Sequence, residues 1–335
     1  MFSRFAKYAL LLGLEILVIG CLVYLLAEKM RGAPALAPTA TITASLTPPE
    51  RMHELVFVGD MMFDRSIRRV IERTGDPLAP FALIAERLRA ADLAIGNLEG
   101  PISDRGTRQG SIYSFRFPPA ETIAALKSAG FDVVSLANNH IWDYGRVGAR
   151  DTMQQLRDAG IKYMGFGETH DEANAPVIQR IGSTMVALLG YTEFYGKTLW
   201  ADDRLGVSEF DPDVIVERIA EIKRSKTADI VVVSLHWGVE YKTQSNAAQQ
   251  KIARKLIDAG ADLIIGHHPH VPQEIEYYNG RAIVYSLGNF VFDQNFSEET
   301  RRGLLVSVLV QSGKIISVVP EKLRFTADYQ PYIAE

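Results

Sequence analysis

The sequence predicts an α/β fold built around a buried, largely parallel sheet. From residue 54 onward, short apolar runs alternate with longer amphipathic runs. The apolar runs are continuous, as in strands that are covered on both faces. The 335 residues, 47% hydrophobic and 23% charged, are enough for one large domain or two small ones, which excludes disorder of the whole chain.

Charge and cysteine content exclude several classes of protein. The net charge is −4, whereas a nucleic-acid binder usually has a strong basic excess, so we expect no nucleic-acid partner. Cys21 is the single cysteine. The sequence therefore has no intramolecular disulfide, no cysteine-based zinc site and no iron–sulfur cluster.

The N-terminal region predicts a membrane anchor. Residues 8–27 form an apolar run with Glu15 as its one charge, and about 20 such residues span a bilayer as a helix. Arg4 and Lys7 precede the run, which places residues 1–7 in the cytoplasm and the domain beyond the run outside it. We therefore expect a single-pass membrane protein with the lipid bilayer as a partner.

Two alternatives to a retained anchor stay open. The A-x-A pattern at 35–37 is typical of a cleaved signal peptide, and the residues before Cys21 resemble a lipoprotein signal. Residues 28–50 are rich in Pro, Ala and Thr, and they predict an extended linker between the anchor and the domain.

The remaining elements follow in order along the chain. Strands are predicted at 55–60 and 92–97 and within 131–140, 228–238 and 259–270. Helices are predicted at 80–91, at 120–130 with Gly130 as the stop, and at 246–259, where one apolar face packs on the sheet. The later apolar runs 281–290, 303–311 and 314–323 have no helices between them, so they predict antiparallel or mixed strands of a second sheet, with a hairpin turn at Ser312-Gly313.

Polar side chains follow five of these strands. They are Asp60, Asn97, Asn139, His236 and His268. In open α/β sheets, ligands bind beyond the carboxyl ends of the strands. Oxygen and imidazole ligands gathered at one edge predict a metal site, although Asp60 or the neighbouring Asp64 could instead shape a turn, and His236 could be structural.

Further residues complete this candidate site. Glu99 lies two residues after Asn97, on the same side of an extended chain, and His268 and His270 form a His-x-His pair with the same property. His267 points the other way, towards a supporting position around the metal. His140 is suited to donate a proton to a leaving group, with Asp143 to orient it, and Asn289 follows another strand and could line the pocket.

The motifs GDMMFDR, NLEGPI, SLANNHIWDYG, LHWGVEY, GHHPHVPQ and YSLGNFVFD resemble, in this order, those of the bacterial capsule synthesis CapA family. That family is linked to poly-γ-glutamate, and the resemblance runs from about residue 54 to about 295. The family in turn resembles the calcineurin-like metallophosphoesterases. The resemblance implies a four-layer α/β/β/α sandwich over residues 51–325, with two metals bound at the strand ends.

The sequence departs from the metallophosphoesterase pattern at particular positions. Met62 stands where a histidine ligand is expected, and Asn97 stands where an aspartate would bridge the two metals. The resemblance therefore implies one metal site from Asn139, His236 and His268 with Asn97 or Glu99, and a less complete one from Asp60 and His270. The expected cofactor is one or two divalent ions, namely Mn, Fe or Zn.

The resemblance implies a protein of capsule or poly-γ-glutamate biosynthesis or export, located at the bacterial cell membrane. We expect a metal-dependent hydrolase of a phosphoester, or of an amide or ester bond in an anionic polymer. The alternative is a non-catalytic accessory subunit that binds membrane subunits of a polymer synthesis or export complex. A third possibility is a metal that serves folding alone.

Overall fold

The computed structural model describes residues 2–31, 51–109, 112–195, 199 and 204–334, with side chains from Glu15 onward. Contacts divide the chain into two units, 1–49 and 50–335. The first unit contains helix α1 (Phe2–Arg31), and the second contains every other helix and strand of the described residues.

The second unit alternates strands and helices through most of its length. Its helices are α2 (Arg65–Thr74), η1 (Ala79–Phe81), α3 (Ala85–Arg89), α4 (Pro119–Ala129), α5 (Gly145–Ala159), α6 (His170–Asn174), α7 (Pro212–Ser225) and α8 (Ala247–Asp258). The strands up to the middle of the chain are β1 (His53–Met61), β2 (Leu93–Leu98), β3 (Val133–Ser135), β4 (Lys162–Met164), β5 (Phe166–Gly167), β6 (Val177–Ile181), β7 (Thr184–Thr192) and β8 (Gly206–Val207). The later strands are β9 (Ile230–His236), β10 (Leu263–His267), β11 (Ile275–Tyr278), β12 (Arg281–Val284), β13 (Asn289–Val291), β14 (Arg302–Gln311), β15 (Lys314–Phe325) and β16 (Pro331–Ile333).

Two sheets form the body of this unit. The first has the strand order β16-β15-β14-β1-β2-β3-β4, with β13 beside β1, and its β1 to β4 part is parallel. The second has the order β11-β12-β10-β9-β7-β6 with a parallel centre. A small antiparallel pair joins β5 to β8.

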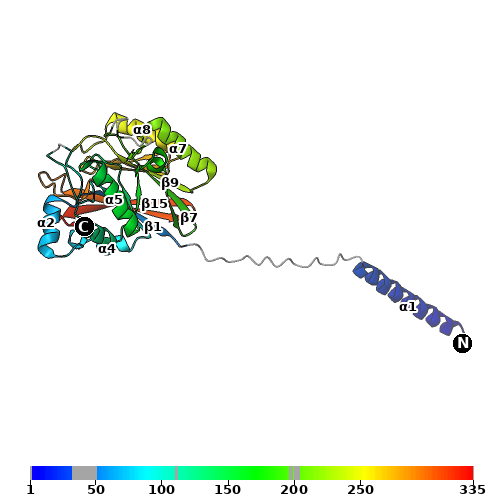
Figure 1. Ribbon diagram of the computed structural model, residues 1–335. Helices are drawn as coiled ribbons and strands as arrows, with labels where there is room; N and C mark the ends of the chain where they lie inside the picture. Colours follow the sequence, from blue (N-terminus) through cyan, green and yellow to red (C-terminus); the bar gives the residue numbers. More distant parts are fainter. Residues whose placement is uncertain (1, 32–50, 110–111, 196–198, 200–203, 335) are drawn as a thin grey trace. The chain divides into compact units, whose positions relative to one another are not determined.

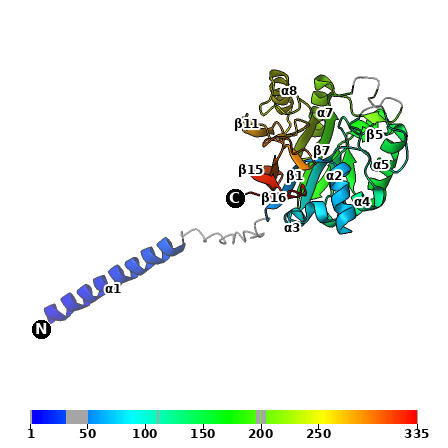
Figure 2. The same cartoon turned by 90° about the vertical axis from the view of Figure 1, so that its left-hand side faces the viewer.

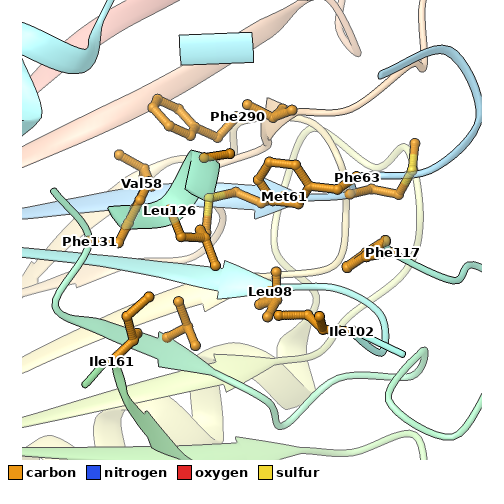
Figure 3. Packing of buried hydrophobic residues seen from close by; sticks show 14 of the residues in the cluster. Val58, Met61, Phe63, Leu98, Ile102, Phe117, Leu126, Phe131, Ile161 and Phe290 are labelled. Atoms are coloured by element: carbon orange, nitrogen blue, oxygen red, sulfur yellow. The ribbon is translucent and has the colours of Figure 1, made fainter. Parts of the chain in front are cut away.

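The sheets pack face to face, with helices on their outer sides. In β1, Leu55 and Phe57 belong to an apolar cluster shared with the second sheet, whereas Val56 and Val58 face a cluster with residues from α2 to α5. A third cluster joins the second sheet to α7 and α8. Figures 1 and 2 show α7 and α8 on one side of the sheets and α2 and α4 on the other, and Figure 3 shows Met61 and Leu98 from the first sheet near Leu126 of α4.

This layering explains the continuous apolar runs in the sequence, because both faces of each central strand are buried. The predicted α/β fold is confirmed, and the layers follow the order helix, sheet, sheet, helix. The Ser312-Gly313 turn joins β14 to β15, and both its residues have positive φ values of 49° and 76°, as a two-residue hairpin turn requires.

Three details differ from the sequence prediction. The second sheet exists, but β14 and β15 join the first sheet, where β14 pairs antiparallel with β1 and β15 pairs antiparallel with β14. The predicted strand at 281–290 is split into β12 and β13, which belong to different sheets. The predicted helix at 80–91 is broken into η1 and α3, because the turn after η1 separates two short helical segments.

The predicted membrane anchor is corrected by the structure. Among the described residues, no helix is long and apolar enough to cross a membrane. The single-pass location in the cell membrane, with residues 1–7 in the cytoplasm and an extracytoplasmic domain, is therefore not retained. Most of the predicted linker, from residue 32 onward, lies outside the described residues.

Because β1 passes very close to the segment before β13, we expect one added methyl group at Gly59 to destabilise the fold strongly. A Cβ at Gly59 would lie 1.9 Å from the carbonyl oxygen of Gly288, and backbone cannot yield as a side chain can. We expect Gly59→Ala to lower the free energy of unfolding by about 3 kcal/mol or more, as measured by urea denaturation of the full chain.

Gly160→Ala is the control, because Gly160 has a positive φ of 75° but nothing within 4 Å of the added Cβ. It should cost about 1 kcal/mol, the penalty of the left-handed conformation alone. Equal losses in the two variants would contradict this account of the packing at Gly59.

Candidate functional site

The candidate site lies where the carboxyl ends of strands from both sheets meet. Strand register sets Asp60 of β1 beside Asn97 of β2 and Asn289 of β13. In the second sheet, register pairs His236 of β9 with His267 of β10. The five predicted strand-end residues are thereby brought into one region, with Asn139 in the loop after β3.

Asp60 connects the two sheets. It is fully buried, and its Oδ1 accepts a hydrogen bond from Asn97 Nδ2 at 2.8 Å, while its Oδ2 accepts one from the backbone N–H of His268 at 3.2 Å. The Nδ1 atoms of His267 and His270 lie 3.2 and 3.3 Å from its two oxygens. Burial opposes the charged form of Asp60, but hydrogen bonds and charge from the two histidines outweigh it and hold the pKa of the carboxyl well below its usual range.

Glu99 is the second fully buried carboxylate. Within the described part of the chain, its Oε1 has no hydrogen-bond partner, and it lies 3.6 Å from His270 Nε2 and 3.9 Å from His140 Nε2. Burial raises the pKa of Glu99 well above its usual range. Burial also disfavours the charged form of His270, but the facing carboxylates of Glu99 and Asp60 prevail and raise its pKa to about 9. The two carboxylates thus favour positive charge at this point of the site, and His270 carries it when no cation is bound.

Two overlapping groups of side chains have the spacing for a metal ion. The ligand atoms of Asp60, Glu99 and His270 lie within 4.8 Å of one another, and so do those of Glu240, His268 and His270. Among the described residues, His268 Nδ1 is also buried without a hydrogen-bond partner, and burial lowers the pKa of this imidazole to about 3, which keeps it neutral as a ligand must be. The unpartnered Glu99 and His268 atoms, together with the oxygen and nitrogen donor set, fit one or two divalent cations.

The backbone after β10 has an unusual conformation that directs two histidines into the site. His268 and His270 have positive φ values of 95° and 56°, a conformation that non-glycine residues seldom adopt. Such conformations cost of order 1–3 kcal/mol each and persist where the surroundings impose them. Here the loop aims both imidazoles into the cluster that contains Asp60 and Glu99.

Asn139 and His236 lie at the other side of the cluster. The Oδ1 of Asn139 is 2.8 Å from His236 Nε2, and His236 Nδ1 is 3.3 Å from Asn97 Nδ2. Burial, followed by the nearby His268, holds the pKa of His236 well below its usual range, so its ring is neutral. Asn139 and His236 thus contact each other and belong to neither group of candidate metal ligands.

His140 and Asp143 form a hydrogen-bonded pair at the edge of the site. His140 Nδ1 lies 2.7 Å from Asp143 Oδ2, and the same oxygen accepts the backbone N–H of Phe115 at 2.7 Å. The Phe115 ring packs on the imidazole at a centroid distance of 4.2 Å, and the backbone N–H of His140 donates to Asn138 Oδ1. The ring is thus fixed with Nε2 towards Glu99, and Asn138 has a structural role.

Other predicted residues have supporting contacts. Asn289 Oδ1 is 3.0 Å from His270 Nδ1 and orients that ring. His267 contacts Asp60 but belongs to neither of the two groups of candidate metal ligands. Met62 is buried in the apolar core and its Sδ accepts the backbone N–H of Asp64, so it supplies no ligand. Asp64 accepts backbone N–H groups of Arg65 and Arg116 and caps α2, which settles it as a turn residue.

The sequence interpretation missed Glu240 and the cavity beside the cluster. Glu240 lies four residues after His236 in the motif LHWGVEY, of which only the histidine was considered. The short spacing between the two residues could have indicated that Glu240 lies near the site. A cavity of about 840 Å³ opens onto the site, and its walls include Asn139, His140, Asp143, Glu240 and His270. Solvent and a ligand can therefore reach the cluster.

Metal binding is tested most simply through His270, which belongs to both groups of ligands. After reconstitution of the full chain with Mn, Fe(II) or Zn and removal of free ion, we expect one or two equivalents by elemental analysis, and a loss of most of this metal in His270→Ala. Bound metal should also raise the melting temperature, because it binds the folded state.

His170→Ala is the matched control, since His170 is partly exposed and contacts Glu209 outside the cluster. It should keep the metal content of the unmodified protein. Equal metal content in both variants would remove His270 from the metal centre.

Comparison with known proteins agrees with the sequence motifs. Residues 54–294 match the family model described as "Bacterial capsule synthesis protein PGA_cap". The "Capsule biosynthesis protein CapA" of Bacillus anthracis is 36% identical over 273 residues, which cover 79% of this chain and 66% of the relative. The "PGA biosynthesis protein CapA" of Bacillus subtilis is 39% identical over 253 residues, covering 75% of this chain and 66% of the relative.

A more distant relative is a "Probable polyglutamine synthesis accessory protein" of Mycobacterium tuberculosis, 32% identical over 253 residues, with 70% of this chain and 66% of the relative covered. The chain thus spans slightly less than two thirds of the length of these relatives.

Solved structures share the fold at low sequence identity. A phosphatase from Mycoplasma pneumoniae aligns with a TM-score of 0.51 and 15% identity, over 82% of this chain and 94% of its own. A putative 5′-nucleotidase from Staphylococcus aureus aligns with a TM-score of 0.50 and 17% identity, over 85% of this chain and 55% of its own. These neighbours support a fold of the metallophosphoesterase type, and the family match together with the motifs leads to one conclusion: the chain belongs to the bacterial capsule synthesis protein family PGA_cap, which includes CapA.

Proposed function

We propose that this chain is a metal-dependent hydrolase of capsule or poly-γ-glutamate biosynthesis, which cleaves a phosphoester or an amide or ester bond of an anionic polymer. One observation carries the proposal. The His140–Asp143 pair lines a solvent-accessible cavity, and the free Nε2 of His140 lies 3.9 Å from a buried Glu99 oxygen that has no hydrogen-bond partner in the described residues. A proton donor and a set of metal ligands therefore face the same space.

The residues that would hold the metal are Asp60, Glu99, Glu240, His268 and His270, with Asn97, Asn139 and His236 beside them. A bound divalent ion supplies a Lewis acid that polarises an oxygen of the substrate and lowers the pKa of water. Asn289 holds His270 in place, and the contacts of Asp60 with His267 and His268 hold both sheets at the distance that the cluster needs.

His140 acts as the general acid. Protonated at both nitrogens, it gives the proton on Nε2 to the leaving oxygen or nitrogen as the bond breaks, and it keeps the proton on Nδ1 in the hydrogen bond to Asp143. Asp143 orients the imidazole through the hydrogen bond to Nδ1, and the Phe115 ring restricts its rotation.

A non-catalytic accessory role is the second candidate, and Asn97 favours it. The amide Nδ2 of Asn97 donates to Asp60 Oδ1 and lies 3.4 Å from Glu99 Oε2 and 3.3 Å from His236 Nδ1. An amide group in this position competes with a cation for the same ligand atoms. In this role the chain would bind subunits of a polymer synthesis or export complex.

Hydrolysis should depend on the pair His140–Asp143 without a change in metal content. With the metal-loaded full chain and a panel of phosphoesters and γ-glutamyl amides and esters, we expect His140→Ala and Asp143→Asn each to lower kcat about 100-fold or more. Asp158→Asn, at an exposed carboxylate bonded to Gln154, should leave kcat unchanged.

Metal content and melting temperature are measured for each variant, so that misfolding is separated from loss of the proton donor. A metal-loaded wild-type protein that hydrolyses none of the probes would reject the hydrolase in favour of the accessory role.

A further inference from the structure

The outer wall of the cavity is formed by one face of α2. Arg65 and Arg69 are one helical turn apart, so their side chains lie on the same face. Both line the cavity that His140 and His270 also line. None of the residues considered above as metal ligands or as proton donor comes from this helix.

Arg65 is already occupied. Its guanidinium pairs with Asp293, whose other oxygen accepts the backbone N–H of Ser66 at 3.1 Å. The guanidinium also lies 4.7 Å from the ring centroid of Phe115, the ring that packs on His140. Arg65 therefore supports the wall behind His140, and its charge is balanced within the protein.

Arg69 differs from the other arginines of this helix. Arg68 and Arg73, which do not line the cavity, pair with Glu72 and Asp328. Arg69 donates to the hydroxyl of Ser66 at 2.7 Å, and across the described ranges no carboxylate lies within ion-pair distance of it. Among the arginines of α2, the exposed one that lines the cavity is thus the one without a carboxylate partner in the described residues.

The carboxylates that line the cavity do not balance the charge of Arg69, because each has another partner. Asp293 binds Arg65 and Asp143 binds His140, while Glu240 lies in the group with His268 and His270. Two aromatic side chains line the same cavity: Tyr241 and Phe296 meet edge to face at 5.0 Å, and both are exposed. Exposed rings in a cavity that also contains an unpaired guanidinium suit a ligand with a carbon chain and an anionic group.

We propose that Arg69 is the anion-binding residue of a substrate subsite, which holds a carboxylate or phosphate group that the substrate carries outside the bond to be cleaved. The guanidinium fork matches the paired oxygens of either group. The rings of Tyr241 and Phe296 pack against the carbon chain that links this group to the reacting bond. The role of this subsite in holding a substrate rests on the proposed function, but binding of an anion to Arg69 needs neither metal nor hydrolysis.

The test is direct binding by calorimetry to the full chain, at fixed ionic strength and in the presence of a chelator. The probes are two matched pairs, pentaglutamate with pentaglutamine and glycerol 3-phosphate with glycerol. We expect at least one anionic probe to bind more tightly than its neutral partner, and the pair that responds identifies the anion as carboxylate or phosphate. In Arg69→Gln the affinity for that anion should fall about tenfold or more, as expected when a hydrogen bond to a charged group is lost.

Arg68→Gln is the matched control, since it removes a guanidinium of the same helix that is paired with Glu72 and faces away from the cavity. It should change the affinity less than twofold, and Arg69→Lys, which keeps the charge without the fork, should restore part of the loss. Absence of binding for both anions, equal binding of the neutral partners, or equal losses in the two glutamine variants would overturn the proposal.

These outcomes are separate from the fate of the hydrolase. Binding that depends on Arg69 in a protein that hydrolyses nothing would keep the subsite and reject the activity. Hydrolysis by a protein that shows no Arg69-dependent binding would keep the activity and reject the subsite.

Discussion

Two buried carboxylates impose the constraint on which this structure depends. Asp60 and Glu99 are fully buried, and removing such charges from water is unfavourable unless positive charge and hydrogen-bond donors compensate. Asp60 receives donors from both sheets: the amide of Asn97 beside it in the first sheet, and the backbone N–H of His268 beyond the second. Asp60 can keep these partners only while the two sheets stay packed, so the fold and the chemistry of the site depend on the same contact.

The layered core holds this contact in place. Alternate residues of β1 pack between the sheets and against the helices, which fixes the strand on both faces and delivers Asp60 to its position. Gly59 allows the backbone of β1 to pass close to Gly288, so that Asp60 N–H can donate to the Gly288 carbonyl at 3.0 Å. The cavity then opens at the one edge where strands of both sheets end, between the proton donor His140 and the face of α2 that carries Arg69.

Residues at the ends of buried strands were predictable from sequence, because continuous apolar runs mark the strands and parallel strands end at one edge. Asp60, Asn97, Glu99, His236 and His268 were found in this way. Glu240 and Arg69 were missed, because a loop and a helix face approach the site only through tertiary packing. The roles of Met62 and Asp64 depend on which way each side chain turns. The membrane anchor was inferred from the apolarity of residues 8–27, whereas no described helix is long and apolar enough to cross a membrane.

The most direct test of the metal centre is a crystal structure of the full chain grown with Mn²⁺ and measured with anomalous scattering. The account predicts an anomalous peak within coordination distance of Glu99 and His270, with the Asn97 amide turned so that its Nδ2 no longer points at Asp60. An ordered site in which Asn97 keeps its contact with Asp60 and no peak lies near His270 would contradict it.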